Sequence, residues 1–375
     1  MAGSTFGKNF SITTWGESHG SGIGVVVDGV PAGLEISENE IQAYLNRRKP
    51  GASSFSTKRH ENDYVTIHSG IFEGVTTGAP ISMSIMNSAK KDSPDAPEAT
   101  VYRPGHADYT YDAKYGRRDW RGGGRASGRE TAARVAGGAI AVTILKKLGI
   151  SFCSYVRSIG PVSIKYSECS MDALANSPLN MPDEKATAEA LEYLKGVAEQ
   201  KNSAGGVIEV IVSGLPAGLG EPVFNKLDAA LAGAVMSIGA VKGVEIGDGF
   251  DAATLTGLEN NDVFVGGEKI TKKTNHAGGV LGGISDGSEL ILRAAIKPTP
   301  TVAAEQETVD SNGNNITFEA KNANDTVIVP RAAVVVEAMM AVTILDLMFD
   351  NMHSRMDKIE EYYGKTLGDD QIRLS

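Results

Sequence analysis

The sequence predicts an α+β protein of two similar halves, whose apolar helices pack together behind mostly antiparallel sheets. Three pairs of related segments carry that prediction. VVVDGVPAGL (25–34) recurs as VIVSGLPAGL (210–219), SGIFEGVTTGAPISMSI (69–85) resembles GGVLGGISDGSELILRA (278–294), and AARVAGGAIAVTIL (132–145) resembles AAVVVEAMMAVTIL (332–345). Gly-rich hairpins and Ala/Val-rich helices also look alike in unrelated chains, but three matches in the same order favour a duplication.

Each half reads, in order, as a strand, a turn with Pro-Ala-Gly, a helix, paired strands with glycine turns, and a long apolar helix. Strands joined by such short turns are mostly antiparallel. The polar stretch 170–203 predicts a surface helix and the boundary between the halves. Glu337 and Asp346 interrupt the apolar tract 332–349, which indicates a helix buried in protein rather than in lipid. We expect one domain over 1–375, with halves of about 1–180 and 200–350 and a C-terminal segment 350–375.

The composition limits the partners that this chain can have. Among 375 residues, 46 are acidic and 36 basic, for a net charge of -10. That balance argues against nucleic acid or an anionic membrane as the main partner. The first residues show no charged start before an apolar run, and no stretch is apolar over a full membrane span, so we expect a cytoplasmic protein. Two cysteines and six histidines without HxH or HxxxH spacing predict neither a disulfide scaffold nor a metal site.

Against this acidic background, the stretch YGRRDWRGGGRASGRETAAR (115–134) holds six arginines: Arg117, Arg118, Arg121, Arg125, Arg129 and Arg134. It reads as a glycine turn that enters a helix, with Ser127 as a candidate N-cap and Glu130 in capping-box spacing. Free N–H groups at a helix start and bidentate guanidinium groups predict an anion site. The alternative for two or three of the arginines is pairing with acids such as Asp112, Asp119 and Glu130. A second basic group, NRRKPGASSFSTKRHE (46–61), is either part of the site or solvated.

Two histidines have loop-like surroundings. His19 lies in GESHGSGIG and His106 in YRPGHADYT, among glycine, proline and polar residues. Catalytic groups concentrate in such loops and strand ends, and a histidine exchanges protons near neutral pH. His60 and His353 lie among charged residues and are expected to be exposed. Neither a Rossmann GxGxxG after a strand nor a GxxxxGK[ST] loop is present, so the anion is held in some other way.

The chain closely resembles the chorismate synthase family. The resemblance covers nearly the whole chain, through TTWGESHGSGIGVVVDGVPAG, RRKPG, SGIFEGVTTGAPI, YRPGHADYTYDAKYG, RGGGRASGRETAARVAGGAIA, AVKGVEIGDGF, NHAGGVLGGISDG, IKPTPT and VPRAAVVVEAM. It implies a β-α-β sandwich with a pseudo-twofold axis, assembled as a homotetramer. It also implies conversion of 5-enolpyruvylshikimate 3-phosphate to chorismate by 1,4-anti elimination of phosphate, with reduced FMN and no net redox change. A substrate with two carboxylates and a phosphate would explain clustered arginines in an acidic protein.

The resemblance also implies roles for individual residues. His19 would protonate the departing phosphate, His106 would set the protonation of the reduced flavin, and Asp325 would relay a proton. The residues implied to bind substrate are Ser18, Arg47, Arg48, Arg103, Ser127 and Arg129. Those implied to bind the flavin are Arg125, Ala126, Ser127, Gly239, Ala240, Gly282, Lys297, Pro298, Thr299, Pro300, Thr301 and Ala323.

Two positions depart from the family pattern. Ala323 and Asn324 stand where many members have Arg-His, and Ser54 stands where some have Arg. Loss of one desolvated bidentate guanidinium costs about 2–5 kcal/mol unless another cation, such as Lys58, Arg59 or Lys321, replaces it. Two other functions therefore stay open: a non-catalytic flavin- or anion-binding relative, and a flavin oxidoreductase, which the absence of a visible nicotinamide-binding segment disfavours. Whether NADPH or an external source would reduce the FMN is also left open.

Overall fold

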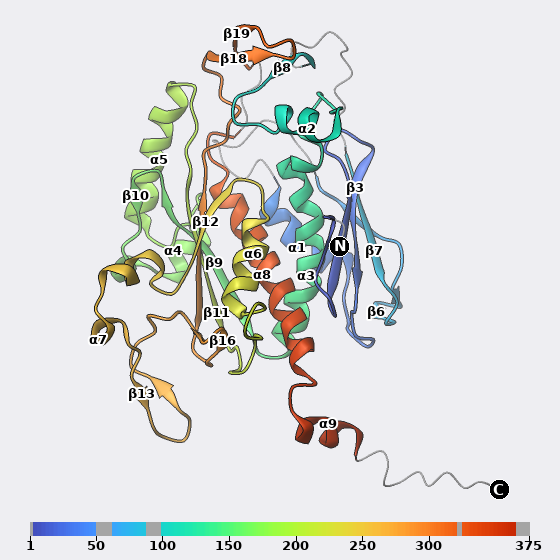
Figure 1. Cartoon of the computed structure of the whole chain (residues 1–375), viewed down its shortest axis with the longest axis vertical. Coiled ribbons are helices and arrows are strands. Elements are labelled where there is room, and N and C mark those ends of the chain that lie inside the picture. Colours follow the sequence, from blue (N-terminus) through green and yellow to red (C-terminus); the bar gives the residue numbers. More distant parts are fainter. Residues whose placement is uncertain (1–2, 50–61, 88–98, 321–324, 365–375) are drawn as a thin grey trace, which may run out of the picture.

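The computed structural model describes residues 3–49, 62–87, 99–320 and 325–364. Two five-stranded antiparallel sheets enclose a middle layer of helices, with one sheet on each side in Figure 1. The first sheet has the order β1 (Thr5–Phe6), β2 (Ser11–Gly16), β3 (Gly22–Asp28), β7 (Ile81–Met86), β4 (Val65–Ile67). The second has the order β10 (Val162–Ser163), β9 (Ser151–Ile159), β11 (Gly206–Ser213), β17 (Leu290–Ile296), β12 (Val241–Ile246).

The two sheets repeat one pattern. In each, a central strand pairs with the strand that follows the glycine hairpin, β3 with β7 and β11 with β17. The side chains of β7 and β17 alternate between buried and half-exposed, because every second residue faces the helices. The outer neighbours of these pairs also correspond. β2 and β9 lie next to the central strands β3 and β11, and β4 and β12 lie next to β7 and β17. The predicted antiparallel α+β fold is therefore confirmed.

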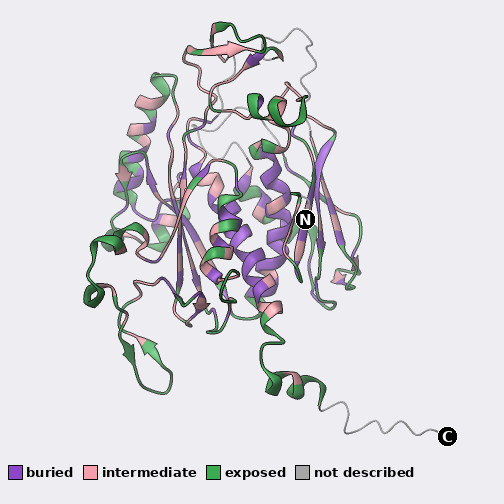
Figure 2. Ribbon diagram, in the orientation of Figure 1, coloured by how far each residue is buried: buried purple, intermediate pink, exposed green. Residues whose placement is uncertain are grey.

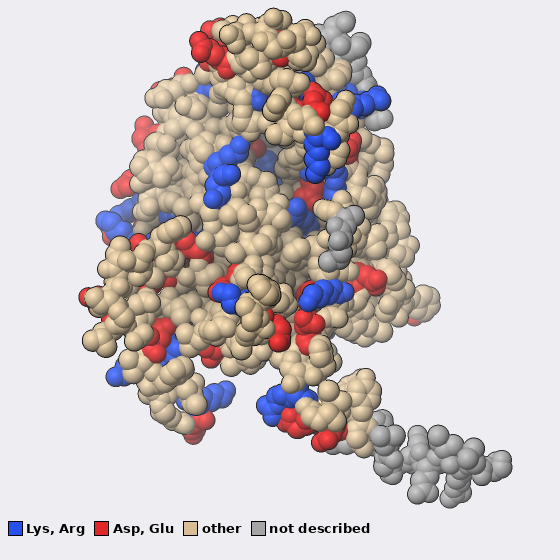
Figure 3. Space-filling view, viewed as in Figure 1, with Lys and Arg blue, Asp and Glu red and all other residues tan. Residues whose placement is uncertain are grey.

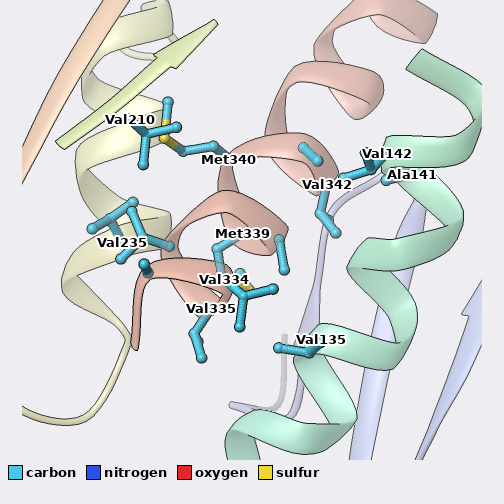
Figure 4. Packing of buried hydrophobic residues seen from close by; sticks show 14 of the residues in the cluster. Val135, Ala141, Val142, Val210, Val235, Val334, Val335, Met339, Met340 and Val342 are labelled. Atoms are coloured by element: carbon cyan, nitrogen blue, oxygen red, sulfur yellow. The ribbon is translucent and has the colours of Figure 1, made fainter. Parts of the chain in front are cut away.

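The middle layer consists of α1 (Glu38–Arg48), α3 (Thr131–Lys147), α6 (Leu227–Met236) and α8 (Val329–Asn351). A capping box of Ser37 and Glu40 starts α1, and Pro330 lies in the first turn of α8. Of these helices, α3 and α8 are mostly buried (Figure 2), since apolar residues surround both of them, whereas α1 and α6 bury one face only. Figure 4 shows Val135 and Val142 of α3 on the side that faces α8.

The helices α3 and α8 cross where the sequence repeat predicts equivalent positions. A Cβ placed on Gly138 would lie 2.4 Å from the Cβ of Ala338, so only glycine permits this approach. In the alignment of 132–145 with 332–345, these two residues occupy the same place. A contact between equivalent residues is what a twofold relation produces at its axis. The packing of α3 on α8 thus supports the pseudo-twofold arrangement.

Smaller elements surround the sandwich. At the upper end in Figure 1, a cap is formed by α2 (Asp108–Tyr115) and the sheet of β8 (Val101–Tyr102), β18 (Gln306–Asp310) and β19 (Asn315–Phe318). The hairpins β5 (Ile71–Phe72) with β6 (Val75–Thr76) and β15 (Val280–Leu281) with β16 (Ile284–Ser285) lie at the lower end. The stretch 170–203 forms two helices, α4 (Met171–Asn176) and α5 (Glu184–Glu199), where one was predicted. The remaining elements are α7 (Gly257–Asn260), β13 (Phe264–Val265), β14 (Thr271–Lys272) and α9 (Met356–Tyr363).

One helix among the described residues is long and apolar enough to cross a membrane. It is α8, and 78% of its most apolar window is buried inside the protein. The prediction of a helix buried in protein is therefore confirmed for 332–349. The division of the chain into halves and a C-terminal segment stays a prediction.

Candidate active site

The candidate site lies at the upper end of the sandwich, where loops from both halves meet the first turn of α3. Ser127 caps the short 3-10 turn Gly128–Glu130, and its side chain accepts from the N–H of Arg129 at 3.2 Å. The predicted capping box is wrong. The Glu130 carboxylate instead accepts from Thr14 Oγ1 of β2 at 3.0 Å and from Arg134 Nε, one turn further along α3, at 2.8 Å.

A buried group of charges lies directly beside this turn. Asp63 is fully buried between Arg48 and Arg129, whose side chains are 4% and 5% exposed. Arg48 Nη1 donates to Asp63 Oδ2 at 2.8 Å, and Arg129 Nη1 donates to Oδ1. Arg48 also donates to the carbonyl oxygen of Gly128 at 2.8 Å. Burial and then the nearby charge of Arg331 lower the pKa of Arg48 to about 10, so it stays charged at neutral pH.

A second carboxylate completes this group. Asp325 is 6% exposed, and Arg331 Nη1 donates to its Oδ2 at 2.9 Å. Arg331 Nε also donates to the backbone oxygen of Arg48 at 3.1 Å. We call Arg48, Arg129, Arg331, Asp63 and Asp325 the charged cluster. Among the described residues it holds three cations and two carboxylates, and this surplus positive charge in a buried place favours an anion.

His19 lies at one side of the turn. A Cβ on Gly122 would lie 2.1 Å from the imidazole Cδ2 of His19, so the backbone of the arginine stretch touches the ring. Ser18 is 3% exposed, and its Oγ has no hydrogen-bond partner among the described residues. Asp119 also belongs here: hydrogen bonds from Arg121 and the charge of His19 hold the pKa of this carboxyl below its usual range. A buried hydroxyl without a partner beside a histidine fits a place for a polar ligand.

His106 is fixed in the cap by both ring nitrogens. Nδ1 lies 2.9 Å from the carbonyl oxygen of Pro104, and Nε2 lies 2.8 Å from Thr301 Oγ1. Because the carbonyl only accepts, Nδ1 carries the proton and Nε2 of the neutral ring accepts from Thr301. Burial, followed by the nearby charge of Arg103, lowers the pKa of His106. The ring is therefore uncharged at neutral pH.

The predicted flavin segment 297–301 packs against the loop of His106. Lys297 Nζ donates to the carbonyl oxygen of Gly105 at 3.0 Å, and the backbone N–H of Lys297 donates to Ala240 at 2.9 Å. A Cβ on Gly239 would lie 4.0 Å from the carbonyl oxygen of Ala126. The structure thus brings 125–127, 239–240 and 297–301 together. A small pocket on the cap side is lined by Arg103, Pro104, His106, Pro300, Thr301, Val302, Ala304, Gln306, Phe318 and Ala320.

This region suits a phosphorylated flavin. Thr299 is 8% exposed, and its Oγ1 has no hydrogen-bond partner in the described chain. Lys297, two residues earlier in the same segment, is half-buried, and Gly239 leaves open space that a side chain would fill. Figure 3 shows Lys and Arg side chains gathered on the upper part of this face. A buried hydroxyl and a cation can bind the phosphate of a flavin, and an open backbone edge leaves room for the edge of its ring system.

Several predicted residues do not join the others. Arg47 lies outside the charged cluster, because both of its terminal nitrogens donate to Glu337, at 3.0 and 2.6 Å. Consecutive residues of a helix point about 100° apart, so Arg47 and Arg48 leave α1 in different directions, and a role of Arg47 in substrate binding stays a prediction. Gly282 lies near the start of α6, since the N–H of Leu227 donates to Gly283. Gly239 and Ala240 follow the other end of this helix of 10 residues, roughly 15 Å away. Arg103, by contrast, does join other predicted residues: it binds Asp108 through two nitrogens, at 2.8 Å each, and lines the same pocket as His106, Pro300 and Thr301.

The arginine stretch divides as the alternative interpretation predicted. Three of its six arginines pair with the three named acids: Arg118 with Asp112, Arg121 with Asp119, and Arg134 with Glu130. Arg125 donates to the backbone oxygens of Gly16 and Thr14 at the end of β2. Only Arg129 enters the charged cluster. Ala323, Ser54, Lys58, Arg59, His60 and Lys321 lie outside the described residues.

Sequence reasoning missed Asp63 and Arg331, which hold the charged cluster together. Arg331 stands in VPRAAVVVEAM, one of the motifs that carry the family resemblance, but nothing in the motif indicates its partners. Asp63 stands in a polar segment without any recognisable motif.

Metal ligands are a separate matter. In the part of the chain that the structure describes, no three His, Cys, Asp or Glu side chains are grouped as a metal ion would need.

Comparisons with known proteins agree on one family. The family model described as "Chorismate synthase" matches residues 10–349. A chorismate synthase of Lachnoclostridium phytofermentans is 58% identical over 97% of this chain and 100% of its own length. One of Archaeoglobus fulgidus is 52% identical over 92% of this chain and 96% of its own. A crystal structure of chorismate synthase, 32% identical, matches 96% of this chain and 98% of its own chain with a TM-score of 0.76.

Proposed function

This chain belongs to the chorismate synthase family, and from that premise we propose how its residues carry out the family's reaction. It acts as a carbon–oxygen lyase that eliminates phosphate from 5-enolpyruvylshikimate 3-phosphate in the 1,4-anti sense, with reduced FMN and no net redox change. The observation that carries the proposal is the charged cluster. Three guanidinium groups face two carboxylates beside the first turn of α3, so the site attracts an anionic substrate.

Substrate binding falls to residues around the start of α3. Arg48 and Arg129 both donate to Asp63, so their guanidinium groups are oriented before the substrate arrives. Ser127 and the unpartnered hydroxyl of Ser18 supply further donors. Such preorganised donors stabilise the negative charge that gathers on the departing phosphate without reorganising during the reaction.

Proton transfer falls to the two histidines. His19, packed on Gly122 beside Ser18, protonates an oxygen of the departing phosphate. His106 is uncharged at neutral pH and carries its proton on Nδ1, with Thr301 fixing the opposite side of the ring. Asp325 is held by Arg331 and serves as a proton relay. Hydrogen bonds fix the orientation of His106 and of Asp325, as proton transfer requires.

The flavin would be held by Arg125, Ala126, Ser127, Gly239, Ala240 and the segment 297–301. Lys297 and the buried hydroxyl of Thr299 suit its phosphate. When bound, reduced FMN supplies electron donation to help expel phosphate and accepts the hydrogen that the ring loses. Gly282 lies near the start of α6, at the opposite end of that helix from Gly239 and Ala240. Its role in flavin binding therefore stays a prediction, as does that of Ala323.

One anaerobic assay tests the proposal against its alternatives. The protein is incubated with dithionite-reduced FMN and 5-enolpyruvylshikimate 3-phosphate, while phosphate, chorismate and flavin absorbance are followed. We expect phosphate and chorismate in equal amounts with no flavin consumed. Flavin binding without product would identify a non-catalytic relative. Flavin oxidation in proportion to reduced substrate would identify an oxidoreductase.

Assembly, location and reductant are further parts of the proposal. We infer a cytoplasmic homotetramer, on the resemblance to the family. Its small-molecule substrate, and neither nucleic acid nor membrane, is its main partner, in agreement with the net charge of -10. NADPH is one candidate for the source of electrons that keeps FMN reduced.

A further inference from the structure

Arg331 connects two groups to which the proposed function gives different tasks. It lies in the first turn of α8, and its side chain is 21% exposed. Nη1 donates to Asp325 Oδ2 at 2.9 Å, while Nε donates to the backbone oxygen of Arg48 at 3.1 Å. One planar guanidinium therefore fixes the carboxylate of the proposed proton relay and the backbone of the proposed substrate-binding arginine.

The bond to Arg48 has a particular effect, because Arg48 is the last residue of α1. The last carbonyl groups of a helix lack partners within the helix, and a cation there is favourable. Arg331 satisfies one of these groups and so anchors the end of α1 on α8. From that anchored backbone, the Arg48 side chain extends in the other direction to Asp63 and to the carbonyl oxygen of Gly128 before α3.

Among the described residues, Asp325 and the backbone oxygen of Arg48 are the hydrogen-bond partners of Arg331. Its closeness to the guanidinium of Arg48 is unfavourable by itself, since the charge of Arg331 helps to lower the pKa of Arg48. Two like charges are held together here by carboxylates on either side, Asp325 for Arg331 and Asp63 for Arg48. Holding the two arginines close to each other costs some electrostatic energy. Such unfavourable pairs of like charges are common at functional sites.

We propose that Arg331 is a positioning residue that fixes Arg48 and Asp325 relative to each other and thereby aligns substrate binding with proton transfer. The proposal rests on the proposed function, because that function supplies the tasks of Arg48 and Asp325. Arg331 acts through these two residues and not by contact with the substrate. Lysine cannot replace it fully, because a single ammonium does not reproduce the fixed fork that spans a carboxylate and a carbonyl oxygen.

The test compares Arg331→Gln and Arg331→Lys with Arg293→Gln. Arg293 is a matched control, since its Nε also donates to a carboxylate, Glu245, at 3.0 Å, and its Nη2 to the backbone oxygen of Gly247. It lies on β17, outside the site. We expect Arg331→Gln to lower kcat/KM for phosphate release by about 10²-fold, the size of effect that a displaced reacting group produces. KM should rise and kcat should fall, since both partners of Arg331 move. Arg331→Lys should lose about 10-fold, and Arg293→Gln should stay within about twofold.

A double substitution separates positioning from a general structural role. In an Arg48→Gln protein, the further rise in KM caused by Arg331→Gln should shrink to less than about twofold, because the effect on KM passes through Arg48. If the two effects multiply in full, or if Arg331→Gln behaves like Arg293→Gln, the proposal is overturned. If Arg331→Gln does not fold, Arg331→Lys decides by the same comparison. An inactive wild-type protein would instead refute the proposed function, so the two failures are distinct.

Discussion

The hairpin β5–β6 in the first half and the hairpin β15–β16 in the second are held by matching hydrogen bonds, whereas the opposite ends of the two halves carry different side chains. Thr76 and Ser285 each accept from a backbone N–H at 2.9 Å, that of Leu34 or Leu219. Each hydroxyl also donates to a proline carbonyl, Pro31 at 2.7 Å or Pro216 at 2.6 Å. A third bond joins Gly33 to Thr76 and Gly218 to Ser285, at 2.9 Å in both.

At the other end of the molecule the equivalence is lost. The arginine-rich turn before α3 supplies Arg125 and Arg129, while the segment before α8 supplies Asp325, with Arg331 in the first turn of the helix. Equivalent helices thus bring complementary charges to a single place. The repeated end provides a stable frame, and the diverged end provides the chemistry. Substitutions at the two ends should therefore change different measurable quantities.

The largest expected effect on stability comes from the buried carboxylate of the diverged end. Asp63→Asn leaves two buried guanidinium groups without their counter-charge, which costs about 3–5 kcal/mol. Chemical denaturation would measure the free energy of unfolding. The control is Asp357→Asn at an exposed pair with Arg355, where the side chains are 58% and 68% exposed and solvent screens the charges, so the expected cost is much smaller. Equal costs at the two sites would contradict the buried position of Asp63.

The histidines should affect turnover without affecting the fold. His19→Ala and His106→Ala are each expected to lower kcat by about 10²-fold or more, the usual loss for a proton-transfer group. Steady-state phosphate release with saturating reduced FMN measures this. His353→Ala is the control, because this residue is exposed and far along the chain from the site. Near-normal rates in both variants would remove their proposed roles.

The repeated end should respond equally in both halves. Thr76→Val and Ser285→Ala each leave a buried N–H and a carbonyl group without a hydroxyl partner, at a cost of about 1–3 kcal/mol. We expect the two costs to agree within about 1 kcal/mol and kcat/KM to stay unchanged. A large cost in one half alone would show that the two hairpins are not equivalent.

The smallest expected effect concerns the pH dependence of the free energy of unfolding, and it comes from His106 at the diverged end. The pKa of His106 is lowered in the folded protein, so below about pH 6.5 the unfolded chain binds a proton more readily than the folded one. Stability must then fall as the pH decreases from 7 to 5. Unfolding by urea at several pH values should show a shallower decrease for His106→Gln than for wild type. Identical slopes would mean that His106 titrates alike in both states.

The fold could be predicted because its causes are local or repeated. The alternation of β7 and the matched glycine turns are visible in the sequence and appear in the structure. The contact of Gly138 with Ala338 follows from the repeat itself, although the sequence does not reveal the distance. The capping box at Ser127 failed for a different reason. The Glu130 carboxylate binds Thr14, from a distant strand, and Arg134, one turn further along α3, instead of the backbone at Ser127.

The site could be predicted less completely, because charge pairing depends on tertiary structure. Motifs identified His19 and His106, and the arginine stretch indicated an anion site. Nothing local distinguishes Arg47, which binds Glu337, from Arg48, which enters the charged cluster, except the turn of the helix between them. Asp63 and Arg331 come from distant segments, and only the packing of α1, α3 and α8 brings them together.

The most direct test of the account measures kcat/KM for phosphate release in Arg129→Gln and in Thr76→Val, at a temperature where both proteins are folded. The diverged end should carry the function, so Arg129→Gln is expected to lose about 30-fold or more, the effect of removing one desolvated charged partner. Thr76→Val should match wild type. If Arg129→Gln keeps full activity, or if both variants lose the same amount, the charged cluster is not the substrate site.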